Sequence, residues 1–201
     1  MARQTSPPKS PIFTAGSYAH ADSTYVSTWR AKAIAFLRVA FGMVWAIAAW
    51  LKWQPQFINS FSEKVSASQN GQPAAIQAWI SFWSHLISTN PHVFAYLLAS
   101  TETAIAVFLI CGILTNLTCV VSLLLSLGIW SVGEGFGGPY KLGESTDVGT
   151  ALVYALLSGV LLAIAAGRYY SVDQWLTSRL GRFGFLAAGV PWHRWPRPIL
   201  R

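Results

Sequence analysis

The sequence has few charged residues. They make up 10 % of its 201 positions, against about 25 % in an average globular chain. Hydrophobic residues make up 53 %, and they stand in long uninterrupted runs. This composition excludes a cytosolic enzyme, a nucleic-acid-binding protein and a disordered chain. It indicates an all-α membrane protein in contact with the lipid bilayer.

Cysteine is almost absent as well. Cys111 and Cys119 are the two cysteines of the chain, and both lie inside apolar runs. Two buried thiols eight positions apart exclude a disulfide framework, a zinc site and a Cys-x-x-Cys redox centre. We therefore interpret both as structural and expect no metal site.

Four apolar runs are long enough to cross the bilayer, which takes about 20 helical residues. They cover residues 33–51, 93–114, 117–132 and 148–166. The sequence thus predicts a four-transmembrane-helix bundle in a membrane domain over residues 33–168. A flexible cytoplasmic tail is expected at 1–32, and a basic, tryptophan-containing cytoplasmic tail at 169–201.

Basic residues predict the orientation. The two terminal segments hold ten Lys and Arg, and the two loops on the opposite side hold three. Because cytoplasmic segments carry the excess of Lys and Arg, both termini are predicted to be cytoplasmic. The loops at 52–92 and 133–147 then face outward.

The first outer loop contains a helical pattern over residues 73–88. Apolar residues recur there at three- and four-residue steps, from Ile76 through Trp79, Ile80 and Trp83 to Ile87. This spacing is typical of an amphipathic helix that lies in the membrane interface. An extra interfacial helix is therefore predicted in this loop.

Two charges fall inside the apolar runs, where an ionisable residue is costly and normally has a partner or a function. They are Arg38 in the first run and Glu102 in the second. One interpretation is a buried ion pair between them. The alternatives are that Arg38 reaches back to the inner interface, and that Glu102 is protonated or hydrogen-bonded to Thr101, Thr103 or Tyr154.

The second outer loop is rich in glycine between Trp130 and Asp147. Glycine lets the backbone approach a ligand closely, and the amides at the start of the fourth helix attract anions. Lys52 and Lys141 are the outward-facing cations that would complete an anion site there. In this interpretation Thr146 or Asp147 caps the helix. The alternative is that glycine only makes a tight re-entrant turn and that Asp147 serves as an N-cap.

The spacings Arg38-x3-Gly42-x9-Lys52 and Glu102-x9-Gly112-x2-Thr115, followed by a Thr-Asp-x-Gly start of the fourth run, resemble the DoxX/DoxD family of small membrane proteins. The resemblance covers about residues 33–168. Asn116 departs from it, because the family usually has a basic residue there.

The resemblance implies a prokaryotic cytoplasmic-membrane subunit of an oxidoreductase, a thiosulfate:quinone oxidoreductase in the DoxD case. Quinone would accept the electrons, and a second oxidoreductase subunit would be needed because the chain has no recognisable motif for a redox cofactor. We hypothesise that Glu102 relays protons while Arg38 fixes its charge. Substrate-binding candidates are Lys52, Lys141, Glu134, Asp147, Tyr154 and Trp130. The alternatives are a non-catalytic scaffold that recruits a soluble redox enzyme, and a small proton-coupled carrier.

Overall fold

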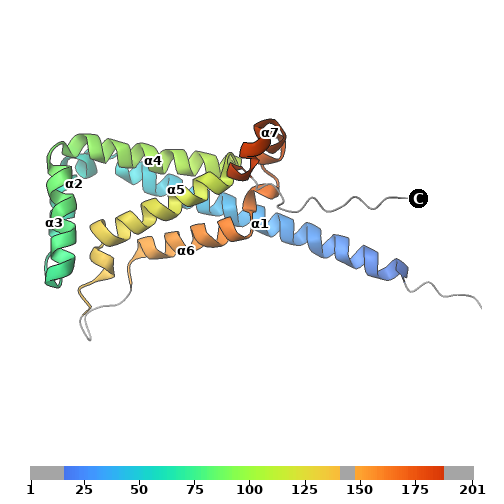
Figure 1. Ribbon diagram of the computed structural model, residues 1–201, viewed down its shortest axis with the longest axis horizontal. Coiled ribbons are helices and arrows are strands. Elements are labelled where there is room, and N and C mark those ends of the chain that lie inside the picture. Colours follow the sequence, from blue (N-terminus) through green and yellow to red (C-terminus); the bar gives the residue numbers. More distant parts are fainter. Residues whose placement is uncertain (1–15, 141–147, 188–201) are drawn as a thin grey trace, which may run out of the picture.

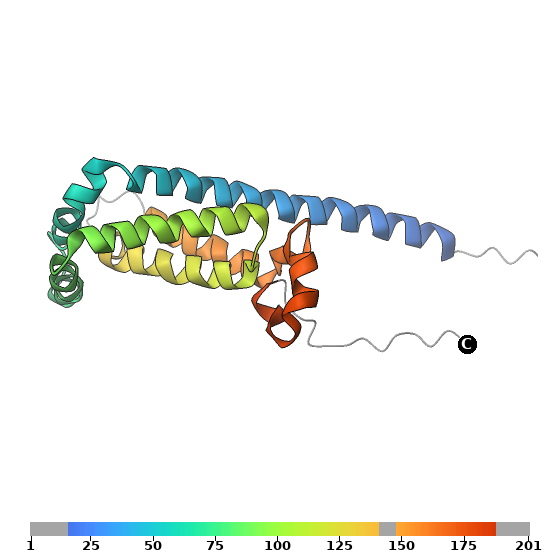
Figure 2. The same cartoon turned by 90° about the horizontal axis from the view of Figure 1, so that it is seen from above.

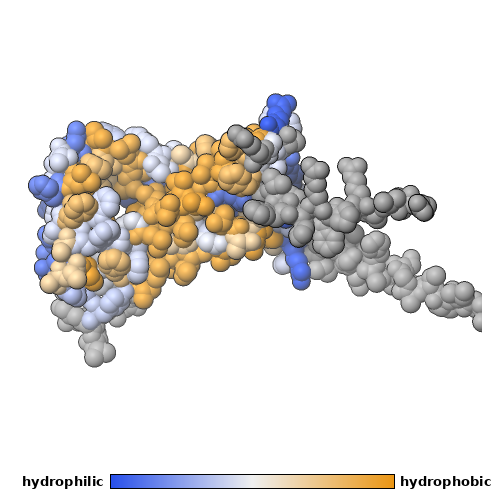
Figure 3. All heavy atoms as spheres, in the orientation of Figure 1, coloured by the Kyte–Doolittle hydropathy of each residue, from blue (hydrophilic) through white to orange (hydrophobic). Residues whose placement is uncertain are grey.

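The computed structural model describes residues 16–140 and 148–187. Within these ranges the chain is helical and contains no strand. Three helical stretches are long and apolar enough to span a membrane, Thr28–Lys52, Pro91–Cys111 and Thr115–Gly133. The molecule is an all-α membrane protein, as predicted. On the face shown in Figure 3, apolar residues cover the middle of the bundle, and more polar residues lie toward its ends.

The bundle consists of two helix pairs. Helix α1 (Gly16–Lys52) packs along α4 (Pro91–Cys111), and α5 (Thr115–Gly128) packs along α6 (Thr150–Ala163). The α4–α5 hairpin joins the pairs at one end, and from there they diverge (Figure 1). Helices α2 (Pro55–Ala67) and α3 (Ala74–Ser88) lie across the open end, and we call these two helices the cap.

Local sequence explains where α4 and α5 begin and end. Pro91 starts α4, since its missing N–H and fixed φ suit a first turn. Gly112 ends α4 with φ 69°, a left-handed conformation that glycine adopts without strain. The amides of Leu114, the residue before α5, and of Thr115, its first residue, donate to the two carboxylate oxygens of Asp173 at 2.7 and 2.8 Å. The carboxylate thereby satisfies N–H groups that a helix start leaves unpaired.

Small and aromatic side chains fill the interior. Gly42 brings α1 into close contact with α4 near Ile110, and the hydroxyls of Ser122 and Ser158 lie 2.7 Å apart between α5 and α6. Toward the closed end, Phe41 and Trp45 pack with Leu109, Cys119 and Leu161 in one buried cluster. Close approach of small residues is how helices associate within a bilayer.

The N-terminal segment differs from the prediction of a flexible tail up to residue 32. Helix α1 begins at Gly16 and extends well past the other helices (Figure 2). The described part of this segment has no proline, so the membrane-spanning helix continues at little cost once it has nucleated.

The last span is shorter than predicted. Helix α6 ends at Ala163 rather than near Gly167, because Ala165 turns into the left-handed region with φ 49°. Its 14 residues measure about 21 Å, less than the roughly 30 Å of the hydrocarbon layer. A 3-10 turn, η3 (Ala166–Arg168), follows.

The residues after η3 fold back onto the closed end of the bundle. Helix α7 (Asp173–Leu180) and the 3-10 segment η4 (Gly181–Leu186) follow one another there. The backbone N–H of Asp173 donates to Gly112 O at 2.9 Å, and the amide side chain of Asn116 donates to Phe185 O at 2.9 Å. We call residues 168–187 the terminal hook. This part of the predicted tail is therefore an ordered element of the bundle.

The cap contains both an expected and an unexpected helix. The predicted amphipathic helix at 73–88 is confirmed as α3. Helix α2 was not predicted, although Pro55 at its first turn and the apolar spacing Phe57, Phe61, Val65 are helix signals. Ser66 and Ser84 connect the two helices through hydroxyls 2.9 Å apart.

Candidate functional site

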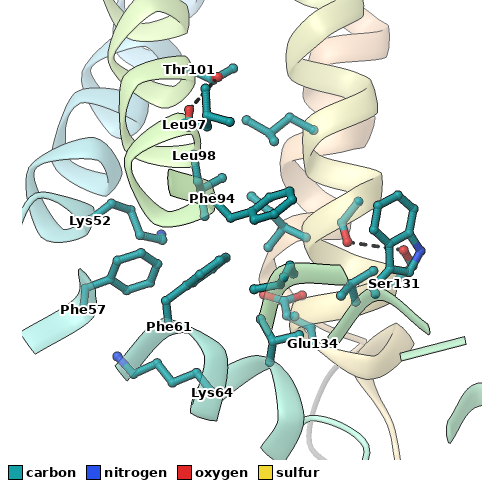
Figure 4. A pocket seen from close by; sticks show the side chains of 18 of the residues that line it. Lys52, Phe57, Phe61, Lys64, Phe94, Leu97, Leu98, Thr101, Ser131 and Glu134 are labelled. Carbon is teal, nitrogen blue, oxygen red and sulfur yellow. Dashed lines mark hydrogen bonds between the residues drawn. The ribbon is translucent and has the colours of Figure 1, made fainter. Parts of the chain in front are cut away.

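A cavity lies between the diverging helix pairs, beneath the cap. Its volume is about 490 Å³, within the range of small-molecule sites. The wall is largely aromatic and aliphatic, with a few polar groups at its edge (Figure 4). Its aromatic residues come from α2, α3 and α4, namely Phe57, Phe61, Trp79, Trp83 and Phe94.

The end of α5 forms the opposite wall. Beyond Gly128 the helix widens into a π-helical turn, η1 (Ile129–Gly133), which contributes Ile129, Ser131 and Val132 to the lining. The hydroxyl of Ser68, at the end of α2, donates to Val132 O at 2.6 Å. Such π-turns often occur at functional sites in helices, and this one connects the cavity wall to the cap.

Lys52 is the charged group that connects the cavity with the membrane interior. It is the last residue of α1, it lines the cavity, and its Nζ lies 3.5 Å from Glu102 Oε1. Glu102 itself is 1 % exposed and sits behind Lys52 rather than in the cavity wall. Its Oε2 has no hydrogen-bond partner among the described residues. Lys52 is thus placed to contact both a ligand and the buried carboxylate.

A second cation stands at the cavity edge. Lys64, on α2, lines the cavity, and both its Nζ and that of Lys52 lie 5.2 Å from the centre of the Phe57 ring. Lys64 was not predicted as a site residue, because the part of the chain that forms α2 was expected to be a loop. The spacing of Phe57, Phe61 and Lys64, four and then three residues, could have indicated that Lys64 shares one helix face with the two aromatic residues.

The predicted pairing of Arg38 with Glu102 is wrong. Arg38 lies at the closed end, 14 positions before Lys52 on α1, or about 21 Å along the helix. The first spanning run was predicted to begin at residue 33, but α1 runs well beyond the bundle, so Arg38 is level with the end of α4. Glu102 instead lies beside Lys52, at the other end of α1.

Arg38 is buried and bonds to backbone carbonyls. Its Nε donates to Leu109 O at 3.0 Å, and its terminal nitrogens donate to the carbonyls of Ala166, Tyr169 and Tyr170 at 2.9–3.1 Å. The guanidinium is therefore enclosed by the protein and bonded to it, rather than exposed at the interface. It ties the end of α4 to the chain that follows α6, and this is a structural role.

The hydrogen-bonding alternatives for Glu102 are also not found. Thr101 and Thr103 donate to carbonyls within α4, at 2.8 and 2.7 Å. Tyr154 lies in the core, where its ring packs edge-on against Phe41 and Trp45 at centroid distances of 5.8 and 5.3 Å. Tyr154 does not line the cavity.

Glu134 occupies the start of α6. Its carboxylate accepts hydrogen bonds from the Thr150 hydroxyl at 2.7 Å and from the Ala151 amide at 3.1 Å. The anion that the helix start attracts is thus supplied by the chain itself. Thr146, Asp147 and Lys141, the remaining residues of the predicted anion site, lie outside the described residues.

Trp130 supports the same turn. Its indole N–H donates to Val148 O at 2.8 Å, and its ring packs against Phe136. Of the predicted substrate-binding residues, the structure therefore brings Lys52 and Glu134 to the cavity, while Trp130 and Tyr154 lie elsewhere.

The sequence profile of the DoxX family matches residues 33–135, just over half of the chain. The chain belongs to the DoxX family. The matched region runs from the spanning part of α1 to Gly135, just beyond η1. It contains Arg38, Gly42, Glu102 and all the residues that line the cavity. No curated protein and no solved structure matches this DoxX chain.

Proposed function

We propose that this DoxX chain is the quinone-binding membrane subunit of an oxidoreductase, with both termini in the cytoplasm and thiosulfate as the reductant. The observation that carries the proposal is the aromatic cavity with Lys52 at its edge and Glu102 behind it. A quinone offers a flat ring, two carbonyl oxygens and an apolar tail. These features match an apolar cavity with few polar groups.

The free hydrogen-bonding capacity of the wall favours a ligand with acceptor atoms. The hydroxyls of Thr101 and Ser131 already donate to carbonyls within their own helices, and the Glu134 carboxylate is bound to the start of α6. An ammonium carries three donors, so Lys52 keeps donors in addition to the one directed toward Glu102. We therefore propose that the Lys52 ammonium donates a hydrogen bond to a quinone oxygen.

Reduction of a quinone to its quinol takes two electrons and two protons. Two thiosulfate ions supply the electrons when each gives up one and a sulfur–sulfur bond forms between them. We assign this oxidation to a partner subunit at the cap end. Lys52 would give a proton to the quinone oxygen, and Glu102 would take up a proton from water and return it to Lys52; a second round of the same transfer would supply the second proton. Lys52 thus takes the place that the sequence had suggested for Arg38 beside Glu102.

The binding step can be tested by filling the cavity. Gly128 lies in its wall, and a Cβ atom there meets no other atom within 4 Å. We expect Gly128→Phe to reduce binding of a short-chain quinone at least tenfold without loss of stability, measured by quenching of tryptophan fluorescence in detergent. The matched control is Gly159→Phe on α6, which is equally unobstructed and outside the cavity. Equal quinone affinity in both variants would contradict the proposed site.

The chemical step needs a separate test. We expect Glu102→Gln to retain quinone binding but to slow thiosulfate-dependent quinone reduction in membranes about a hundredfold, the usual scale for loss of a proton-transfer group. Glu63→Gln is the control, since Glu63 is exposed on α2 and outside the cavity wall. Turnover unchanged in Glu102→Gln would exclude the relay. No turnover by the wild type with candidate partners would favour the scaffold, and proton-coupled uptake into vesicles would favour the carrier.

A further inference from the structure

The cavity beneath the cap extends into the hydrocarbon layer of the membrane. The lining residues farthest from the cap are Thr101 on α4 and Leu125 on α5. Thr101 lies ten positions after Pro91, the first residue of α4, which is about 15 Å along the helix axis. Leu125 lies eight positions before Gly133, the end of its spanning stretch, which is about 12 Å. Because both helices span the membrane, this part of the cavity lies at the level of the acyl chains.

The cavity is open on the side between α4 and α5, where the two helix pairs diverge (Figure 1). Leu97 on α4 lines the cavity, yet its side chain is 57 % exposed. Gly128 on α5 also lines the cavity and is exposed. In Figure 4, Leu97, Leu98 and Thr101 lie on one side of the space and Ser131 lies on the other. Residues that border both the cavity and the outer surface mark an opening, and at this level the opening faces lipid rather than water.

The two sides of this opening are apolar. The charged residues of the cavity wall, Lys52, Lys64 and Glu134, lie on α1, on α2 and beyond η1. The Thr101 hydroxyl already donates to Leu97 O within α4, at 2.8 Å. A polar ligand group would leave its hydrogen bonds unmade there, whereas a hydrocarbon chain has none to make. The residues of α4 and α5 that line the cavity are uncharged, namely Phe94, Leu97, Leu98, Thr101, Leu125 and Gly128.

From the depth, the exposure and the apolar sides of this opening, we propose that the ligand enters the cavity from the bilayer between α4 and α5 and that its long hydrocarbon tail stays there. The inference rests on the proposed quinone site. Lys52 and Leu97 line the same cavity, so a quinone ring bound at Lys52 extends its tail past Leu97 into the lipid. The substrate is then a membrane quinone with a long isoprenoid tail, and Leu97 determines specificity for that tail.

The test compares two quinones with the same ring, one with a short tail and one with a long isoprenoid tail. Binding to the full chain in bilayer discs is measured from the partition of each quinone between discs with and without the protein. We expect Leu97→Trp to weaken binding of the long-tailed quinone about tenfold, the scale of a steric conflict, and to leave the short-tailed quinone unaffected. The matched control is Val107→Trp, because Val107 is 48 % exposed on the same helix and lies outside the cavity wall.

A second measurement does not depend on any substitution. A long-tailed quinone that carries a photoreactive diazirine on the first unit of its tail is irradiated with the wild type in discs, and the labelled residues are identified by mass spectrometry. We expect the label on the residues of α4 and α5 at the opening, Leu97, Thr101 and Leu125. A label confined to α2 and α3 would overturn the proposal.

Two further results would also overturn it. One is equal affinity of Leu97→Trp and Val107→Trp for the long-tailed quinone. The other is an equal loss of both quinones in Leu97→Trp, which would place Leu97 at the ring instead of the tail. These results would leave the quinone site itself standing, because the short-tailed quinone would still bind the wild type. If neither quinone binds the wild type, the quinone site is wrong, and the path of the tail is wrong with it.

Discussion

Replacing Arg38 with glutamine is expected to lower the free energy of unfolding by about 3 kcal/mol or more, since hydrogen bonds from a charged donor contribute about 1.5–3 kcal/mol each. The arginine donates to four carbonyls from α4, η3 and the start of the hook. A glutamine side chain is shorter and carries two donor hydrogens, so most of these buried carbonyls would lose their partner. The lost hydrogen bonds are at the closed end of the bundle, where the two helix pairs meet.

Cys119 provides the measurement for this variant. It is fully buried in the core, whereas Cys111 is exposed. In a Cys111→Ser background, a thiol-reactive dye reports the thermal unfolding that exposes Cys119. Arg30→Gln is the matched control, because Arg30 is an exposed arginine on the same helix. Coincident unfolding curves for Arg38→Gln and Arg30→Gln would contradict the role given to Arg38.

Replacing Gly42 with leucine is expected to separate α1 from α4. A Cβ at this position lies 2.8 Å from Ile110 Cγ1, 3.0 Å from the Ile110 amide nitrogen and 3.2 Å from Ala106 O. Two of these atoms belong to the backbone, so rotation of a side chain cannot make room. Overpacking of this kind costs about 1–3 kcal/mol, and we expect the upper end because the longer side chain must push two helices apart.

The same dye assay measures the effect, with Gly159→Leu as the control on a helix face where a Cβ meets no atom within 4 Å. A further comparison isolates the contact. Gly42→Ala should be destabilising, and Ile110→Ala should restore part of that loss in the double variant, since Ile110 Cγ1 is the nearest obstacle. Additive effects of Gly42→Ala and Ile110→Ala would show that the two positions do not interact.

The features that depend on local sequence were predictable. The runs of apolar residues located three spans long enough to cross the membrane, and the period of 3.6 located α3. The cost of buried charge correctly selected Arg38 and Glu102 as unusual residues, since each is 1 % exposed. Lys52 was selected for a different reason, as an outward-facing cation that would complete an anion site.

The partners of the charged residues were not predictable, because they depend on the position of each helix along the axis of its neighbour. Arg38 lies beside the end of α4 because α1 continues beyond the bundle, and no composition signal in residues 16–32 marks that continuation. The role of Glu134 at the start of α6 required knowing that the chain turns back between η1 and Gly149. Asp173 could have been singled out, because it is the only acidic residue in the basic segment 168–201. Its partner, the amide of Thr115 58 positions earlier, could not have been predicted.

Because the two helix pairs are joined at one end and diverge toward the other, a small rotation at the joined end moves the far ends of the helices. Arg38 and the α4–α5 turn lie at the closed end, and the cavity lies near the far end of α4, whose 21 residues measure about 31 Å. A lever of that length turns a rotation of about 5° at the pivot into a displacement of about 3 Å at the tip. A change in the four hydrogen bonds of Arg38 is therefore expected to alter the width of the cavity at the opposite side of the membrane, where the bond from Ser68 to Val132 O also holds the cap to the end of α5.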